Sequence, residues 1–116
     1  MITVVNKHKH KGTQFDFYIG RGSPLGNPWT HLSSRMTLAK YQATSRDDAI
    51  AKYTIWLTLE LREPHSAAAR EFNRILKIAQ SHDVWLVCYC KPRPCHGDII
   101  KKLMENLLFD GNIRTV

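Results

Sequence analysis

The sequence predicts a small α/β domain of Rossmann-like character, a three-layer sandwich with a mostly parallel sheet. The chain has 116 residues, enough for a single domain over 1–116 and too few for two ordinary ones. Strand-like and helix-like patterns follow one another in the order strand, strand, helix, helix, strand, helix. The last of the strands is apolar on both alternating faces, which is typical of a central parallel strand covered on both sides.

The first part of the chain contains two predicted strands and a loop. Ile2–Asn6 is rich in β-branched residues and 15–19 is a second short strand. Three glycines and two prolines then fall within the nine residues 20–28, which we call the glycine loop, and they exclude a helix or a regular strand there. Residues 29–44 have no clear period and are expected to be irregular.

The second part of the chain predicts helices and one strand. Ser45 followed by Asp48 is typical of a helix N-cap, and the helix is expected to stop at Pro64. A second helix is expected from Ser66 to about Gln80, and a buried strand over 84–90. A third helix follows the loop and is expected to stop at Gly111. The apolar faces of the first and third helices are Ile50, Tyr53, Leu57 and Leu61, and Ile99, Ile100, Leu103, Met104, Leu107 and Leu108.

Composition limits the class of protein. Seventeen Lys and Arg against ten Asp and Glu give a net charge of +7, which favours an anionic partner such as a nucleotide, a nucleic acid or an acidic protein. No apolar run approaches the ~20 residues of a membrane span, and 1–11 carries charges where a signal peptide is apolar. Three cysteines within 88–95 are an odd, crowded set, unlike a secreted disulfide framework. We therefore expect a cytoplasmic protein without a membrane partner.

The glycine loop has the composition of an anion site. Glycines allow backbone N–H groups to face an anion, and the Arg21 guanidinium matches two oxygens of a phosphate or carboxylate. Gly22, Ser23 and Asn27 add a flexible backbone position, a hydroxyl and an amide. The loop lacks the Lys-Ser/Thr pair of a Walker loop. The competing interpretation is a tight structural turn.

The segment 88–98, which we call the cysteine segment, predicts reactive groups. A helix N-terminus lowers the pKa of a thiol, so Cys95 is a candidate nucleophile. His96 and Asp98 are candidates for proton transfer. An alternative is a zinc site formed by Cys88, Cys90, Cys95 and His96. An extended Cys-x-Cys lacks the turn of a zinc knuckle, adjacent ligands fit a tetrahedron poorly, and Cys88 also suits a small buried apolar position.

Both motifs together resemble one family. Gly-Arg-Gly-Ser-x-Leu-Gly-Asn-Pro, Cys-x-Cys-Lys-Pro-x-x-Cys-His-Gly-Asp and the stretch 46–57 are similar to the domain of unknown function 4326 family of bacteria and phages. The likeness extends from Asn6 to about Leu108. It implies that the family's marked positions are Asn6, Arg21, Gly22, Asn27, Pro28, Cys88, Cys90, Lys91, Pro92, Cys95, His96, Gly97 and Asp98.

The leading hypothesis is a protein that binds a nucleotide or a related phosphorylated small molecule where the two loops meet. Arg21 would hold the phosphate, Asn6 and Asn27 would position it, and Lys91 would lie nearby. If the ligand is also processed by Cys95, His96 and Asp98, the chain is a nucleotide-processing hydrolase or transferase. The alternatives are a non-catalytic basic protein that binds nucleic acid or a host protein, and the zinc domain. No other cofactor is expected.

Overall fold

The structure, a computed structural model, describes residues 1–30 and 41–114. The described residues contain three helices and a parallel sheet of three strands with β5 at its centre, which confirms a small α/β domain. None of the described helices combines the length and the apolar character needed to cross a bilayer. In chain order the elements are β1 (Ile2–Asn6), β2 (Asp16–Tyr18), β3 (Trp29–Thr30), β4 (Tyr41–Gln42), α1 (Arg46–Leu61), α2 (Ala67–Ala79), β5 (Val84–Cys88) and α3 (His96–Arg114).

The sheet brings the two unusual loops to the same edge. Both β1 and β2 pair with β5 in parallel, in a register that sets Asn6 opposite Cys88 and Tyr18 opposite Val87. All three strands therefore end at one edge of the sheet. The glycine loop leaves the end of β2 there, and the cysteine segment leaves the end of β5. This is the edge at which open parallel sheets bind ligands.

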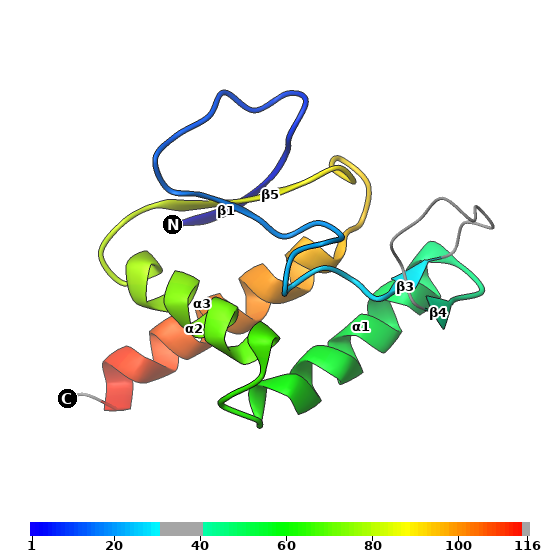
Figure 1. Ribbon diagram of the computed structural model, residues 1–116. Helices are drawn as coiled ribbons and strands as arrows, with labels where there is room; N and C mark the ends of the chain where they lie inside the picture. The colour runs from blue at the N-terminus through cyan, green and yellow to red at the C-terminus, as the bar shows by residue number, and fades with distance from the viewer. Residues whose placement is uncertain (31–40, 115–116) are drawn as a thin grey trace.

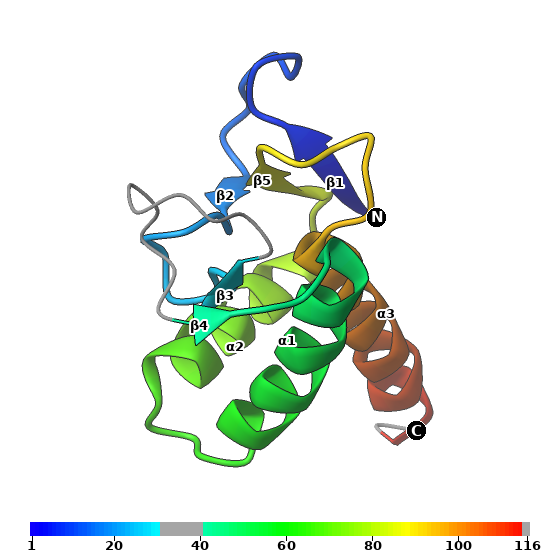
Figure 2. The same ribbon diagram turned by 90° about the vertical axis from the view of Figure 1, so that its right-hand side faces the viewer.

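The helices form one layer rather than two. In both views α1, α2 and α3 lie on the same side of the sheet, and the loop that joins β1 to β2 crosses the other side (Figures 1 and 2). On that side the His10 ring stacks on Trp85, with 6.0 Å between the ring centroids. The apolar outer residues of β5, which suggested helices on both faces, are partly covered by this loop. A three-layer sandwich is not confirmed, and the described residues form two layers.

The core lies between the sheet and the three helices. The helix starts agree with the sequence, because the Ser45 and Ser66 hydroxyls accept hydrogen bonds from the backbone N–H groups of Asp48 and Ala69. The apolar faces then point to the sheet and to one another, and α1 packs against both α2 and α3. Leu107 is an exception, because it is exposed on α3 although its spacing predicts a buried position. Fully buried members of the core include Ile2, Ile19, Tyr53, Leu57, Phe72, Ile75, Leu86, Ile100 and Met104.

The secondary structure differs from the sequence prediction in several places. The strand expected over 84–90 ends at Cys88, because the chain turns out of the sheet there. Within 29–44, where no regular structure was predicted, the two-residue strands β3 and β4 pair in parallel, and 31–40 lies outside the described residues. Helix α3 continues through Gly111, since a single glycine costs only about 1 kcal/mol and does not by itself end a helix.

Candidate functional site

The glycine loop and the cysteine segment meet around one pocket of about 210 Å³. Arg21 and His96 both line it, and the first turn of α1 forms a further wall. A buried hydrogen bond ties the cysteine segment to the residue directly before the glycine loop, because His96 Nε2 lies 2.6 Å from the carbonyl oxygen of Ile19. The expectation that segments some seventy positions apart converge on one hollow is therefore confirmed.

Three arginines make this pocket strongly basic. Arg21 comes from the glycine loop, Arg46 is the first residue of α1, and Arg93 belongs to the cysteine segment. The described lining residues include no carboxylate. A pocket with this lining attracts an anion.

Arg21 is the most constrained of these cations. One terminal nitrogen, Nη2, donates a hydrogen bond to the Trp29 carbonyl oxygen at 2.6 Å. Its Nε is buried and has no hydrogen-bond partner among the residues that the structure describes. Burial lowers the pKa of Arg21, and the charge of Arg46 adds to that effect. The charge of Cys90 opposes this shift, but the described lining offers the guanidinium no carboxylate, and a bound anion would lower the cost of its burial.

His96 is held as a neutral imidazole of defined orientation. Its side chain lies almost entirely inside the protein, and burial lowers its pKa. A carbonyl oxygen can only accept, so the contact with Ile19 assigns the proton to Nε2. Nδ1 therefore carries the lone pair, and it lies 3.6 Å from Cys95 Sγ. The His96 and Tyr53 rings pack edge to face, with 5.0 Å between the centroids.

The three thiols form a cluster beside this imidazole. The Sγ atoms of Cys88, Cys90 and Cys95 all lie within 4.8 Å of one another, and the distance between Cys88 Sγ and Cys95 Sγ is 3.4 Å. Hydrogen bonds from the Cys88 and Cys95 thiols lower the pKa of Cys90 to about 2. Hydrogen bonding to Cys90 raises the pKa of Cys88, and hydrogen bonding to Cys88 and Cys90 raises that of Cys95. This group could hold a metal ion.

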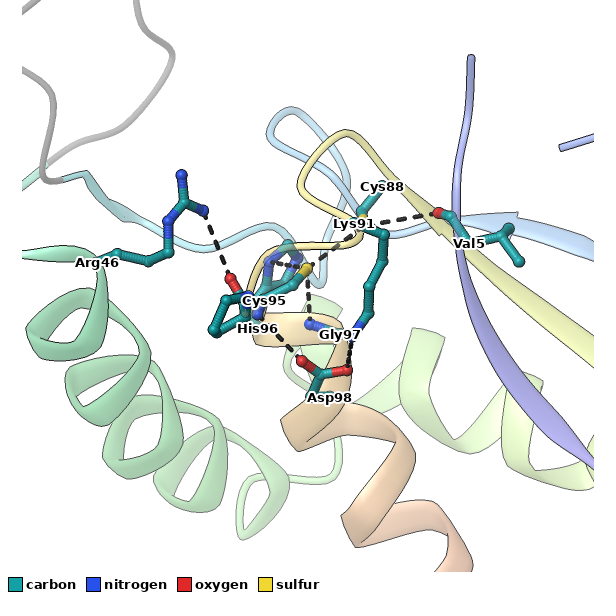
Figure 3. Close-up of polar contacts among 9 residues, drawn as sticks. Val5, Arg46, Cys88, Lys91, Cys95, His96, Gly97 and Asp98 are labelled. Atoms are coloured by element: carbon teal, nitrogen blue, oxygen red, sulfur yellow. Dashed lines mark hydrogen bonds and ion pairs between the residues drawn. The ribbon is translucent and has the colours of Figure 1, made fainter. Parts of the chain in front are cut away.

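Asp98, a candidate for proton transfer, caps helix α3. One carboxylate oxygen accepts from the Cys95 backbone N–H at 3.1 Å, and the other forms an ion pair with Lys91 (Figure 3). The Lys91 carbonyl oxygen in turn accepts from Asn6 Nδ2 at 2.7 Å. Asp98, Lys91 and Asn6 are absent from the lining of the arginine pocket. They fix the position of the cysteine segment against β1 and α3.

The polar side chains of the glycine loop bond mostly to the protein backbone. Ser23 Oγ donates to the Gly20 carbonyl oxygen at 2.7 Å. Asn27 is buried, its Nδ2 donates to the Ala49 carbonyl oxygen at 3.2 Å, and its Oδ1 accepts from the Trp29 N–H at 2.9 Å. These contacts hold the loop in shape. Asn27 also lines the arginine pocket, whereas Ser23 lines a neighbouring hollow that shares Arg21.

Two glycines of the loop are required by its shape. Gly22 has a φ of 94°, a conformation that side chains other than glycine rarely adopt. A Cβ on Gly26 would lie 2.6 Å from the backbone oxygen of Gly20. Gly22 therefore serves the turn, and it lines the neighbouring hollow rather than the arginine pocket.

Sequence reasoning did not assign Arg46, Arg93 or the tyrosines Tyr18 and Tyr89 to the site. All four line the pocket. The sequence did contain an indication for Arg46. A cation in the first turn of a helix is unfavourable for the helix dipole, so its presence there suggests a role other than helix stability. The positions of the tyrosines could have been inferred from the strands. Tyr18 is the last residue of β2 and Tyr89 directly follows β5, so both lie where these parallel strands end.

Comparison with known proteins identifies the family. Residues 4–106 match the family described as Domain of unknown function (DUF4326), and this range contains both loops. The chain belongs to the DUF4326 family. This DUF4326 chain is also similar to an uncharacterized 12.4 kDa protein of the nrdA–td intergenic region of Enterobacteria phage T4, with 31% identity over 115 residues, 92% of this chain and 81% of the phage protein. No solved structure matches it.

Proposed function

We propose that this protein binds a nucleotide, or a closely related phosphorylated small molecule, in the arginine pocket. The observation that carries the proposal is the half-buried guanidinium of Arg21, whose buried Nε has no partner among the described residues in a pocket with two further arginines and no described carboxylate. Phosphate groups satisfy such donors best, because each offers several strong acceptor oxygens to planar guanidinium groups.

Two helix starts add to the positive potential. The first turn of α1 lines the pocket through Arg46 and Ala49, and α3 begins at the pocket wall with His96. Helix N-termini carry about half a positive charge from their unpaired N–H groups, and they favour phosphate. The positive charge of Arg46 adds to the positive potential of the helix N-termini.

A nucleotide is the class of phosphorylated ligand that fits the rim. Tyr18 and Tyr89 line the pocket, and both are exposed. Their rings pack edge to face with 6.0 Å between centroids, and Lys7 Nζ lies 5.5 Å from the Tyr18 ring and 5.9 Å from the Tyr89 ring. A base can stack on an exposed tyrosine ring while its phosphate reaches the arginines. The pocket of about 210 Å³ is smaller than most ligand sites, which suits a phosphate and sugar with the base at the rim.

Turnover of the bound nucleotide, by hydrolysis or group transfer, would depend on Cys95 and His96. Both line the pocket, and the lone pair of His96 Nδ1 is the group able to accept a proton there. Asp98 would act indirectly in such a reaction, because it holds the backbone at Cys95.

Titration calorimetry with AMP, inorganic pyrophosphate and adenosine tests the proposal. We expect AMP to bind, pyrophosphate to bind more weakly, and adenosine to bind least. Arg46→Gln should weaken AMP binding about 10–100-fold, the effect of losing a charged hydrogen bond. Arg62→Gln is the matched control, because Arg62 is exposed and caps the opposite end of α1.

Two results would contradict the proposal. One is the absence of binding to any phosphorylated compound. The other is salt-dependent affinity for DNA or RNA that is equal in wild type, Arg46→Gln and Arg62→Gln, since nonspecific binding is spread over many lysines and arginines.

A further inference from the structure

The cysteine cluster has the dimensions of a metal site. A tetrahedral Zn²⁺ with Zn–S bonds of about 2.3 Å keeps its sulfur ligands about 3.8 Å apart. In this protein Cys88 Sγ and Cys95 Sγ are 3.4 Å apart, and Cys90 Sγ lies within 4.8 Å of both. Shifts of a few tenths of an ångström up to about one ångström would place all three at bonding distance from one ion.

The backbone contacts of the cluster differ between its sulfur atoms: the Cys88 thiol donates to the Val5 carbonyl oxygen at 3.6 Å, whereas Cys95 Sγ accepts a hydrogen bond. The Gly97 N–H donates to Cys95 Sγ at 3.3 Å, and Cys95 stands directly before the first residue of α3. A sulfur that accepts a hydrogen bond at a helix start is stabilised as an anion. Contacts of this kind orient the ligands of protein metal sites.

His96 lies next to the cluster without completing it. Its Nδ1 is 3.6 Å from Cys95 Sγ, but among the described residues the ligand atoms that are all within 4.8 Å of one another are the three sulfurs alone. All three cysteines line the arginine pocket. An ion held by them would therefore have its fourth position facing the pocket.

We propose that Cys88, Cys90 and Cys95 bind Zn²⁺ through their sulfur atoms, with the fourth coordination position open to the arginine pocket. Three thiolates select a soft or borderline ion, and zinc forms such sites without redox chemistry. Protons that remain on the thiols pass to solvent on binding. The complex carries one net negative charge, which Arg21 beside it would balance. This metal site does not depend on nucleotide binding. With its sulfur bound to Zn²⁺, Cys95 would act as a metal ligand and not as a nucleophile, which leaves His96 for proton transfer.

Elemental analysis of untagged protein, purified under reducing conditions, tests the metal. We expect about one Zn²⁺ per chain, because a single cluster of this kind is present among the described residues. Cys90→Ser should lose it, and circular dichroism shows whether that variant remains folded. His8→Gln is the matched control for adventitious binding by the exposed N-terminal histidine and should retain the zinc.

Replacement by Co²⁺ tests the coordination and keeps the proposal falsifiable if Cys90→Ser does not fold. A site with three thiolates gives strong sulfur-to-cobalt charge-transfer bands and the intense visible bands of tetrahedral cobalt. Added imidazole should shift the visible bands, because it can enter an open position.

Several outcomes overturn the inference. Metal-free folded protein that forms a Cys88–Cys95 disulfide on mild oxidation removes the metal site. Another metal in stoichiometric amount removes the zinc assignment. Visible bands that imidazole leaves unchanged show a closed site and remove the open position. Failure of AMP binding in zinc-loaded protein contradicts the proposed function and leaves the metal site intact.

Discussion

In the sequence, the glycine loop and the cysteine segment both contain candidate functional residues. In the fold, the two segments have different roles. In the glycine loop, Ser23 and Asn27 bond to backbone atoms, and the loop offers the pocket one half-buried cation, Arg21. In the cysteine segment, the sulfur atoms lie close to one another, Cys95 Sγ also contacts His96, and Cys88 and Cys95 each form a hydrogen bond with the backbone. The difference shows that a glycine-rich motif can be a rigid support, whereas reactive groups collect where the described protein supplies few other partners.

The strongest test of the support role is Gly26→Ala. The new Cβ would lie 2.6 Å from the Gly20 carbonyl oxygen and 2.9 Å from the Arg21 Cα, both backbone atoms that cannot turn away. We expect a loss of about 3 kcal/mol in the free energy of unfolding, measured by urea denaturation. Gly12→Ala is the control, because its nearest neighbour would be 3.7 Å away, and it should change stability by less than about 0.5 kcal/mol. Equal stability of both variants would mean that the loop is not rigid.

Asn27→Ala separates support from ligand binding. The substitution removes a donor to Ala49 and an acceptor from Trp29 in a buried place, so we expect a loss of about 2 kcal/mol in unfolding free energy. Ser23→Ala, which removes one partly buried bond, should cost about half as much. If Asn27→Ala instead leaves stability unchanged and weakens AMP binding, Asn27 belongs to the ligand site.

Asp98→Ala should have a smaller effect than Gly26→Ala or Asn27→Ala. It removes the carboxylate that caps α3 and pairs with Lys91, and we expect a loss of about 1 kcal/mol in the free energy of unfolding. Lys91→Met removes the ion pair alone and should cost less than half of that, as partly exposed pairs do. Loss of AMP binding in Lys91→Met would show that Lys91 reaches the ligand after all.

Much of the fold could be predicted because its signals are local. Helix caps at Ser45 and Ser66 and the stop before Pro64 depend on neighbouring residues, and they agree with the structure. The three helices form a single layer because the segments that contain them all pass on one side of the sheet. The sequence of β5 does not indicate on which side a segment passes. Trp85 is apolar whether a helix or the His10 ring covers it.

The site was predictable to the extent that strand topology places it. Parallel strands that end at one edge brought Arg21 and His96 together without any knowledge of side-chain contacts. The partners of Asn6, Asn27 and Asp98 were not predictable, because an amide or a carboxylate has the same pattern in sequence whether it bonds to backbone or to a ligand. The spacing of the three sulfur atoms likewise depends on how the segment 89–94 turns back on itself.

The hydrogen bond between His96 and Ile19 has a consequence for the way such domains can change. The acceptor is a main-chain carbonyl oxygen, so one apolar residue can replace another at position 19 without loss of this hydrogen bond. The donor is a side chain, so the bond depends on the imidazole N–H at position 96. A chimera that grafts one loop from a relative keeps this bond only if the recipient's strand delivers a carbonyl to the same point. The two loops are therefore best transplanted as a pair.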